Sequence, residues 1–158
     1  MDPTNSNNLY VGALNQAGVF RTTNAGGAWT GSVTGLPNAG SRNITGLTVV
    51  AAVPNRVYAA TLDGVYVSND SGATWTAANA GMTGLNIQRV LVDPGDVNLV
   101  YAASAANGIY VSRDGGTTWQ TFNAGLTNLN TRDLLRIPAS PPRLAIATVG
   151  GGVFQITP

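Results

Sequence analysis

The sequence predicts an all-β fold made of a repeated four-stranded antiparallel unit. An eight-residue pattern that ends in tryptophan occurs three times, with Trp29, Trp75 and Trp119 lying 46 and 44 residues apart. Short apolar or alternating runs recur between these patterns, separated by Gly, Asn, Asp and Pro, as expected for strands joined by turns. The chain contains neither Lys nor Glu, so two strong helix formers are missing.

The repeat extends well beyond the tryptophan pattern. The pattern reads TTNAGGAW at 22–29, SNDSGATW at 68–75 and SRDGGTTW at 112–119. The flanking runs NRVYAAT and NLVYAAS also align, as do GVYVS and GIYVS. A repeated unit of about 44 residues predicts the blades of a β-propeller, because stacking such sheets around an axis buries both faces of each one. A β-sandwich is the alternative, but it gives no reason for a repeat.

The strands of each unit follow from these runs. In the third unit we expect strands at 87–93, 99–104, 108–112 and 118–123. The first segment supplies three strands and the last supplies three more, at 131–137, 144–148 and 152–156. The tally of 3, 4, 4 and 3 strands corresponds to about 3.5 blades. The expected boundaries are a partial blade 1–42, blades 43–85 and 86–129, and a partial blade 130–158. Such ends suggest a piece of a longer propeller, or a ring completed by other copies.

The repeated pattern, called the box below, has the chemistry of a turn. Ser or Thr at its first position and Asp or Asn at its third can accept backbone N–H groups. Gly at the fifth position permits positive φ, and the Trp can bury a large apolar area. We therefore expect these residues to be structural. They are Thr22, Asn24, Gly26, Trp29, Ser68, Asp70, Gly72, Trp75, Ser112, Asp114, Gly116 and Trp119. Asn24 cannot supply a carboxylate, so the first turn is expected to be weaker.

With these three boxes in register, the chain resembles the Asp-box family of β-propellers, also called the bacterial neuraminidase repeat family. It is similar to the propellers of sortilin-type receptors, of xyloglucan-cleaving glycoside hydrolases and of photosystem-assembly factors. The resemblance implies that the boxes lie at the blade periphery, away from a central site. It also implies an extracytoplasmic location, whether secreted, periplasmic or lumenal. Because the family is functionally broad, the resemblance does not choose an activity.

The composition excludes several kinds of catalysis. His and Cys are absent, which removes Ser–His–Asp and Cys–His chemistry and metal sites of imidazole or thiolate. The absence of Glu removes the Tyr–Glu pair that the resemblance implies for sialidases. Glycoside hydrolysis usually needs two carboxylates, but Asp70 and Asp114 belong to boxes, and only Asp133 falls on an expected inner strand. We therefore expect no enzymatic activity, no metal and no cofactor. The alternative is a fragment of a glycoside hydrolase whose site is completed elsewhere.

The remaining candidates point to binding. Arg42, Arg89, Arg132 and Asp133, together with the loop 35–41, are the candidate ligand-binding residues on the expected inner strands and connecting loops. Asp133 and a neighbouring Arg could also form only a local ion pair. The prediction is a non-catalytic binding or scaffolding module for a protein or a glycan, with a purely architectural subunit as a further alternative. A net charge of +1 gives no attraction to nucleic acid, and no run is long enough to span a membrane. Self-association, or docking to the rest of a propeller, is also expected.

Overall fold

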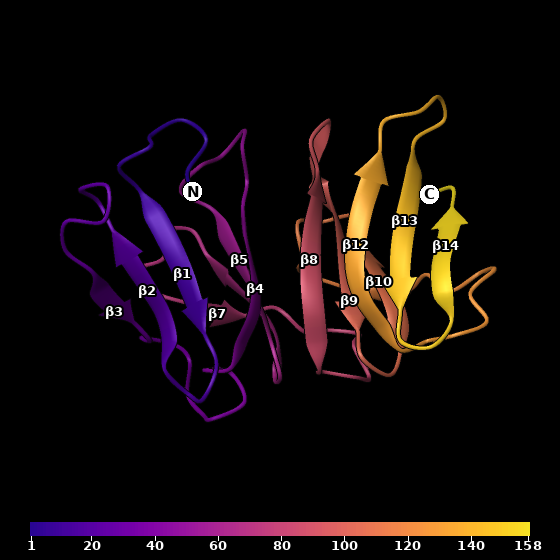
Figure 1. Cartoon of the computed structure of the whole chain (residues 1–158), viewed down its shortest axis with the longest axis horizontal. Helices are drawn as coiled ribbons and strands as arrows, with labels where there is room; N and C mark the ends of the chain where they lie inside the picture. Colours follow the sequence, from indigo (N-terminus) through magenta and orange to yellow (C-terminus); the bar gives the residue numbers. More distant parts are fainter.

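The computed structural model describes residues 1–158 and contains fourteen strands in four antiparallel sheets. The sheets stand side by side like the blades of a partial propeller (Figure 1). Each sheet is a meander, because its strands follow one another in chain order. The prediction of an all-β partial propeller of about 3.5 blades is confirmed.

The strand content of the sheets is three, four, four and three. The first sheet holds β1 (Leu9–Ala13), β2 (Gly18–Thr22) and β3 (Thr30–Ser32). The second holds β4 (Ile44–Val49), β5 (Val57–Thr61), β6 (Gly64–Ser68) and β7 (Thr76–Ala77). The third holds β8 (Ile87–Asp93), β9 (Asp96–Ser104), β10 (Gly108–Ser112) and β11 (Gln120–Thr121). The fourth holds β12 (Thr131–Ile137), β13 (Arg143–Thr148) and β14 (Gly152–Ile156).

Two predicted strands of the third sheet differ from the observed ones. The last strand is only Gln120–Thr121 rather than 118–123, because the N–H of Trp119 donates to the carbonyl of Ala80 in the segment that follows β7. The second strand begins at Asp96 rather than Leu99, because Asp93 and Asp96 pair across the turn. Strand β13 likewise begins one residue early, at Arg143.

The core lies between the sheets rather than within any one of them. Three clusters of buried apolar side chains fill the three seams between neighbouring sheets. The middle cluster combines Tyr58 and Val65 of the second sheet with Val100 and Tyr110 of the third. Because the second and third sheets each pack on two neighbours in this way, apolar residues on both of their faces are buried, as the repeat predicted.

The first strands of the second, third and fourth sheets, β4, β8 and β12, lie side by side and form the surface that we call the inner face (Figure 1). Hydrogen bonds tie two of these strands together. Thr45 Oγ1 donates to the carbonyl of Ile87 at 2.6 Å, and Thr48 Oγ1 donates to the carbonyl of Val90 at 2.6 Å. The inner strands are therefore held in a defined register.

Candidate binding site on the inner strands

A β-bulge occurs at the same place in each inner strand. The register shifts between Ile44 and Gly46, between Ile87 and Arg89, and between Thr131 and Asp133. A bulge adds one unpaired residue and redirects the side chains around it. Arg132 and Asp133 consequently are both exposed, although they are neighbours in one strand, while Thr131 and Leu134 on either side are buried. Each bulge thus turns two consecutive positions toward the inner face.

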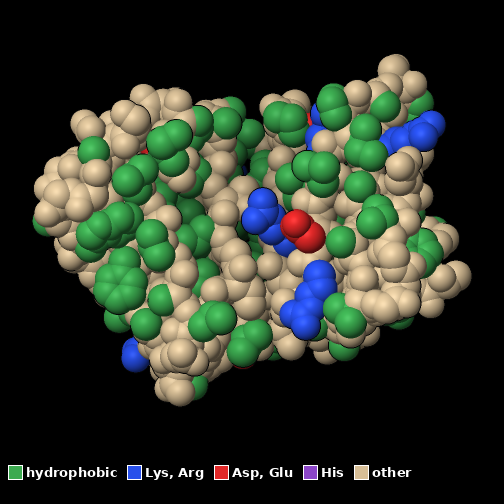
Figure 2. Space-filling model, viewed as in Figure 1, with side chains coloured by type: hydrophobic (Ala, Val, Ile, Leu, Met, Phe, Trp, Pro, Cys, Tyr) green, Lys and Arg blue, Asp and Glu red, His purple; other side chains and the backbone are tan.

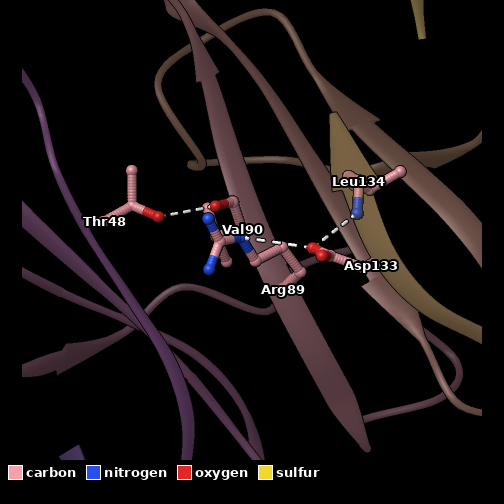
Figure 3. Close-up of polar contacts among 5 residues, drawn as sticks. All are labelled: Thr48, Arg89, Val90, Asp133 and Leu134. Atoms are coloured by element: carbon pink, nitrogen blue, oxygen red, sulfur yellow. Dashed lines mark hydrogen bonds and ion pairs between the residues drawn. The ribbon is translucent and has the colours of Figure 1, made fainter. Parts of the chain in front are cut away.

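Arg89 and Asp133 are brought together across β8 and β12 by these bulges (Figure 3). Arg89 Nε lies 3.5 Å from Asp133 Oδ1, and the side chains are 45% and 65% exposed. The same Asp133 oxygen accepts the N–H of Leu134 at 2.9 Å. An ion pair this exposed adds little to stability, so both groups remain accessible to a partner in solution.

Arg132 makes a second contact between the same two strands. Its Nη1 donates to Gln88 Oε1 at 2.8 Å, and Gln88 Nε2 in turn donates to Asn86 Oδ1 at 2.6 Å. Figure 2 shows basic and acidic side chains gathered near the middle of the face on which β8 and β12 lie. Gln88 was not predicted from the sequence, although the two polar residues followed by an apolar one at 88–90 and at 132–134 could have indicated it.

Arg42 does not join this group. It lies just before β4, and its Nε donates to the carbonyl of Leu36 at 2.9 Å. The candidate loop 35–41 is also more structural than expected, because Leu36 and Ser41 are buried. Asn38 accepts the N–H of Ser41 at 2.9 Å and donates to Asp63 at 2.7 Å, which holds the loop closed. Gly35 and the tip, 37–39, are the exposed parts of the loop.

The second and third boxes form matching hydrogen-bonded turns. Asp70 accepts the hydroxyl of Ser68 at 2.7 Å, and both the N–H and the hydroxyl of Thr74 at 2.9 and 2.6 Å. Asp114 accepts the equivalent bonds from Ser112 and Thr118 at the same three distances. Hydrogen bonds to the charged form, led by the hydroxyls of Thr74 and Thr118, hold the pKa of both carboxyls at about 2.

The first box keeps part of this turn. Asn24 Oδ1 accepts the hydroxyl of Thr22 at 2.7 Å and the N–H of Ala28 at 2.8 Å. The amide oxygen thus replaces one carboxylate oxygen. Ala28 has no hydroxyl, so the side-chain bond that Thr74 and Thr118 make in the other boxes has no counterpart here.

Two further features of the structure were not predicted from the sequence. Arg136 Nε lies 2.8 Å from Asp93 Oδ2 and joins the third and fourth sheets, and both side chains are largely buried. A cavity of about 360 Å³ lies at the rim between the second and third sheets, where Arg56, Asn69, Asn98 and Asp114 are among its lining residues. None of the four candidate ligand-binding residues lines this cavity.

The repeat itself could have indicated the rim cavity. Val67 pairs with Tyr58 in the second sheet, and the equivalent partner of Tyr10 in the first sheet is Arg21. Arg21 Nη1 crosses the equivalent seam and donates to the carbonyl of Ser71 at 3.1 Å. Replacement of this long side chain by Val67 leaves the corresponding space in the second seam open.

The other acidic residues do not gather into a second site. Asp2 accepts bonds from Thr4, Asn5 and Asn8, led by the Asn8 amide, which hold the pKa of its carboxyl at about 2. No three Asp, Glu, His or Cys side chains lie close enough to hold a metal ion. The chain offers no apolar helix of the length that a lipid bilayer requires.

The Sortilin-Vps10 family model, described as sortilin, neurotensin receptor 3, matches residues 63–151. No curated protein matches the chain in sequence.

Solved structures match nearly the whole chain. An ancestral GH74 enzyme is 22% identical with a TM-score of 0.75, and the match covers 99% of this chain and 22% of the enzyme. The GH74 xyloglucanase of Xanthomonas campestris is 20% identical with a TM-score of 0.74, over 99% of this chain and 28% of the enzyme. YCF48 bound to D1 peptide is 18% identical with a TM-score of 0.55, over 89% of this chain and 48% of that protein. At these identities the likeness concerns the fold, and the chain spans less than a third of the two enzymes.

Proposed function

Since the chain belongs to the Sortilin-Vps10 family, we propose that it is a non-catalytic binding module that recognises a partner through its inner face. One observation carries the proposal. Adjacent bulges in β8 and β12 hold Arg89, Arg132 and Asp133 exposed on one surface, while the inter-strand bonds below them fix the backbone. A rigid support with exposed charged side chains suits recognition, because little ordering is required on binding.

A polypeptide is the partner that this surface suits best. The two guanidinium groups and one carboxylate offer charges of both signs within a small area, and Arg is enriched at the residues that dominate protein interfaces. A structural relative, YCF48, is described as bound to a peptide, which supports this choice. A glycan is the second candidate, because amide and hydroxyl groups such as those of Gln88 and Thr45 can bind sugar hydroxyls.

Glycoside hydrolysis is not proposed, although two of the structural relatives are GH74 enzymes. That reaction usually needs a pair of carboxylates on either side of the scissile bond. Two carboxylates lie on the inner strands of this chain, and both are paired: Asp133 with Arg89, and Asp93 at the end of β8 with Arg136. The remaining carboxylates lie in turns or at strand ends. A fragment whose catalytic pair is completed elsewhere is the enzymatic alternative.

We further propose that the three boxes are structural, since their polar groups are engaged in bonds within their own turns. The repeat boundaries 1–42, 43–85, 86–129 and 130–158 remain the proposed units. We also propose an extracytoplasmic location, which membership of the Sortilin-Vps10 family supports. An architectural role, in which the sheets dock to other sheets, is a second function, favoured by the apolar side chains exposed on the two terminal sheets.

Binding should be measured on arrays of tiled peptides and of glycans, with the Arg89→Ala/Arg132→Ala double variant beside the wild type. We expect peptide signals that the double variant loses at least tenfold. Arg143→Ala, which removes an exposed Arg from β13, is the matched control and should retain them. Binding to glycans alone would contradict the proposal that the partner is a peptide. Peptide binding that the double variant retains would rule out the inner face as the binding surface.

The enzymatic alternative has a separate test. The purified chain should be assayed with xyloglucan, mixed-linkage β-glucan and sialyl substrates. We expect no turnover. Hydrolysis that disappears in Asp133→Asn and persists in Asp63→Asn would overturn the non-catalytic proposal.

A further inference from the structure

The cavity at the rim between the second and third sheets occupies a space that is filled in the first seam. By strand register, Val67 is equivalent to Arg21 of the first sheet. The long side chain of Arg21 crosses the first seam and donates to the carbonyl of Ser71 at 3.1 Å. Val67 is too short to do so, and a cavity of about 360 Å³ remains in the second seam. Both sheets that border it are complete four-stranded sheets, so the cavity does not arise at either end of the chain.

Three polar side chains of this cavity can still form hydrogen bonds. Arg56 Nε donates to Asn69 Oδ1 at 3.1 Å, which holds the guanidinium group in the wall. Arg56 forms no ion pair, and its guanidinium group carries further N–H donors. The amide nitrogen of Asn69 and both polar atoms of the Asn98 side chain have no partner within the protein. Donors and an acceptor from three side chains therefore meet at one cavity.

The backbone beside this cavity is largely bonded already. The N–H of Trp75 donates to the carbonyl of Thr34, and the carbonyl of Asn79 accepts the N–H of Met82. The N–H of Ala78 is bonded within its own sheet. A polypeptide that adds as a strand needs a run of free backbone groups, and β7, which is only two residues long, does not offer one. Recognition at this cavity therefore falls to the side chains.

The charges of the lining favour an uncharged ligand. Arg56 contributes a positive charge, and the ionised carboxylate of Asp114 contributes a negative one. A charged ligand would be attracted by one of these groups and repelled by the other. Hydroxyl groups both donate and accept, so they match the guanidinium group and the two amides. The apolar part of the lining is formed by Val67, Ala77, Ala78 and Ala80. Such a surface suits the C–H groups of a sugar ring.

We propose that this rim cavity binds an uncharged sugar, whose hydroxyls bond to Arg56, Asn69 and Asn98. Its volume of about 360 Å³ lies at the lower end of the range of small-molecule sites, about 300–1,000 Å³. Asp114 borders the sugar while its own hydrogen bonds hold the third box closed. No charged residue of the inner face lines the cavity, so this site is separate from the proposed function and does not depend on it.

Titration of the isotope-labelled 158-residue chain, followed by amide NMR spectra, tests the proposal. The probes are glucose, galactose, mannose, xylose and N-acetylglucosamine, each up to about 50 mM, at which even a site with a Kd of about 5 mM is largely filled. The signals of Asn69, Asn98 and Gly115 should shift with at least one sugar. Those of Gln88 and Arg132 on the inner face should not. The absence of any shift overturns the proposal, and so do shifts confined to the inner face.

Charged sugars test the choice of an uncharged ligand. The uronate and the 2-amino counterparts of the tightest-binding neutral hexose each add one charge. Both should bind at least about threefold more weakly than the neutral sugar, because each faces one like charge in the lining. Tighter binding of either one would show that the cavity selects an ion, and it would overturn the proposal of an uncharged ligand.

Variants test whether the sugar lies in the cavity. Val67→Arg restores the side chain type that fills the equivalent space in the first seam, and it should abolish the shifts. Arg56→Ala and Asn98→Ala should each weaken binding at least about tenfold, and they decide the matter if Val67→Arg misfolds. Arg113→Ala is the matched control, because it removes an exposed Arg of the same box that does not line the cavity. It should bind as the wild type does. Sugar binding that survives Arg56→Ala and Asn98→Ala overturns the proposal.

The same variants keep the two binding surfaces apart. The Arg89→Ala/Arg132→Ala variant should retain the sugar-induced shifts, and Val67→Arg should retain peptide binding. Loss of the sugar-induced shifts in the inner-face variant overturns the rim site. A chain that binds sugar at the rim and binds no peptide overturns only the inner-face function.

Discussion

The first box and the two later boxes resemble each other in sequence and differ in how their tryptophans are placed. All three hold their fifth residue at positive φ, with values of 94° at Gly26, 74° at Gly72 and 86° at Gly116. Trp75 and Trp119 nevertheless are 3% exposed, and Trp29 is 42% exposed. The indole N–H of Trp75 donates to Ser32 in the preceding sheet at 3.1 Å. The indole of Trp119 donates to Ala78 at 2.9 Å.

This difference shows that a box does not bury its own tryptophan. The preceding unit supplies the apolar contacts and an acceptor for the indole N–H, which in Trp119 is shared with the carbonyl of Gly116 in its own box at 3.1 Å. The first sheet has no such predecessor in the structure. The box therefore closes a turn locally and connects two sheets only where a neighbour is present. Three pairs of substitutions and one double variant test this distinction.

Removal of the indole should give the largest contrast. Trp75→Ala should lower the free energy of unfolding by about 3–5 kcal/mol, as for a buried aromatic residue, whereas Trp29→Ala should cost less than about 1 kcal/mol. Urea denaturation followed by far-UV circular dichroism, under conditions in which the chain is monomeric, measures both. Equal losses in the two variants would show that the box buries its tryptophan without the preceding sheet.

Substitution of the box glycine should give the next largest effect. Any Cβ at these positions meets the cost of left-handed backbone, about 1–2 kcal/mol. A Cβ on Gly72 would also lie 3.1 Å from the ring of Tyr10 in the preceding sheet, while a Cβ on Gly26 would meet nothing nearer than 3.9 Å. We expect losses of about 2–4 kcal/mol for Gly72→Ala and of about 1–2 kcal/mol for Gly26→Ala, measured by thermal unfolding. A larger loss at Gly26 would contradict the role of the neighbouring sheet.

The tyrosine that faces the following box allows a smaller comparison. Tyr58 Oη donates to the carbonyl of Gly115 in the third box at 2.8 Å. The equivalent Tyr101 faces a sheet without a box, and its buried hydroxyl has no partner. Tyr58→Phe should therefore cost about 1 kcal/mol, whereas Tyr101→Phe should cost nothing or be slightly stabilising. Chemical denaturation of the two variants decides, and a clear loss in Tyr101→Phe would refute this account.

Acid should produce the smallest effect. The carboxyls of Asp70 and Asp114 have a pKa of about 2, below the ordinary value of 3.8, so their contribution to stability is complete above about pH 4 and is lost as the pH falls toward 2. Asn24 does not titrate in the first box. The Asp70→Asn/Asp114→Asn variant should show a shallower acid limb in a plot of melting temperature against pH. Asp2, whose pKa is also about 2, accounts for the slope that remains, and an unchanged limb would contradict the prediction.

Much of this fold could be predicted because the same box and strand pattern occurs three times in the sequence, so each unit confirms the strand assignment of the others. Strands 87–93, 108–112, 131–137 and 152–156 agree with β8, β10, β12 and β14. The final strand of each unit could not be predicted equally well, because its first residues bond to the preceding unit, as Trp119 does to Ala80. Such a contact depends on how two units stack, and no single unit encodes it.

The candidate site was predictable only in part. Placing Asp133 on an inner strand near Arg89 required only the alignment of the units, and the structure has these residues as an ion pair. The position of Arg42 was not predictable in this way, since its contact with Leu36 depends on the path of an irregular loop. The bulges were hidden for a different reason, because one extra residue interrupts the alternation on which strand assignment depends.

The recurrent bulge also distinguishes the positions at which the amino acid can vary from those that the core requires. The inner face receives two consecutive residues from each inner strand, namely Thr45 and Gly46, Gln88 and Arg89, and Arg132 and Asp133. The residues on either side of each pair are at least partly buried in the seams. Recognition can therefore diversify at these positions while the core stays constant, as in a library of variable residues on a fixed scaffold. Two of the six are constrained, because Thr45 Oγ1 donates to the carbonyl of Ile87 at 2.6 Å and a Cβ on Gly46 would lie 3.3 Å from the carbonyl of Gln88.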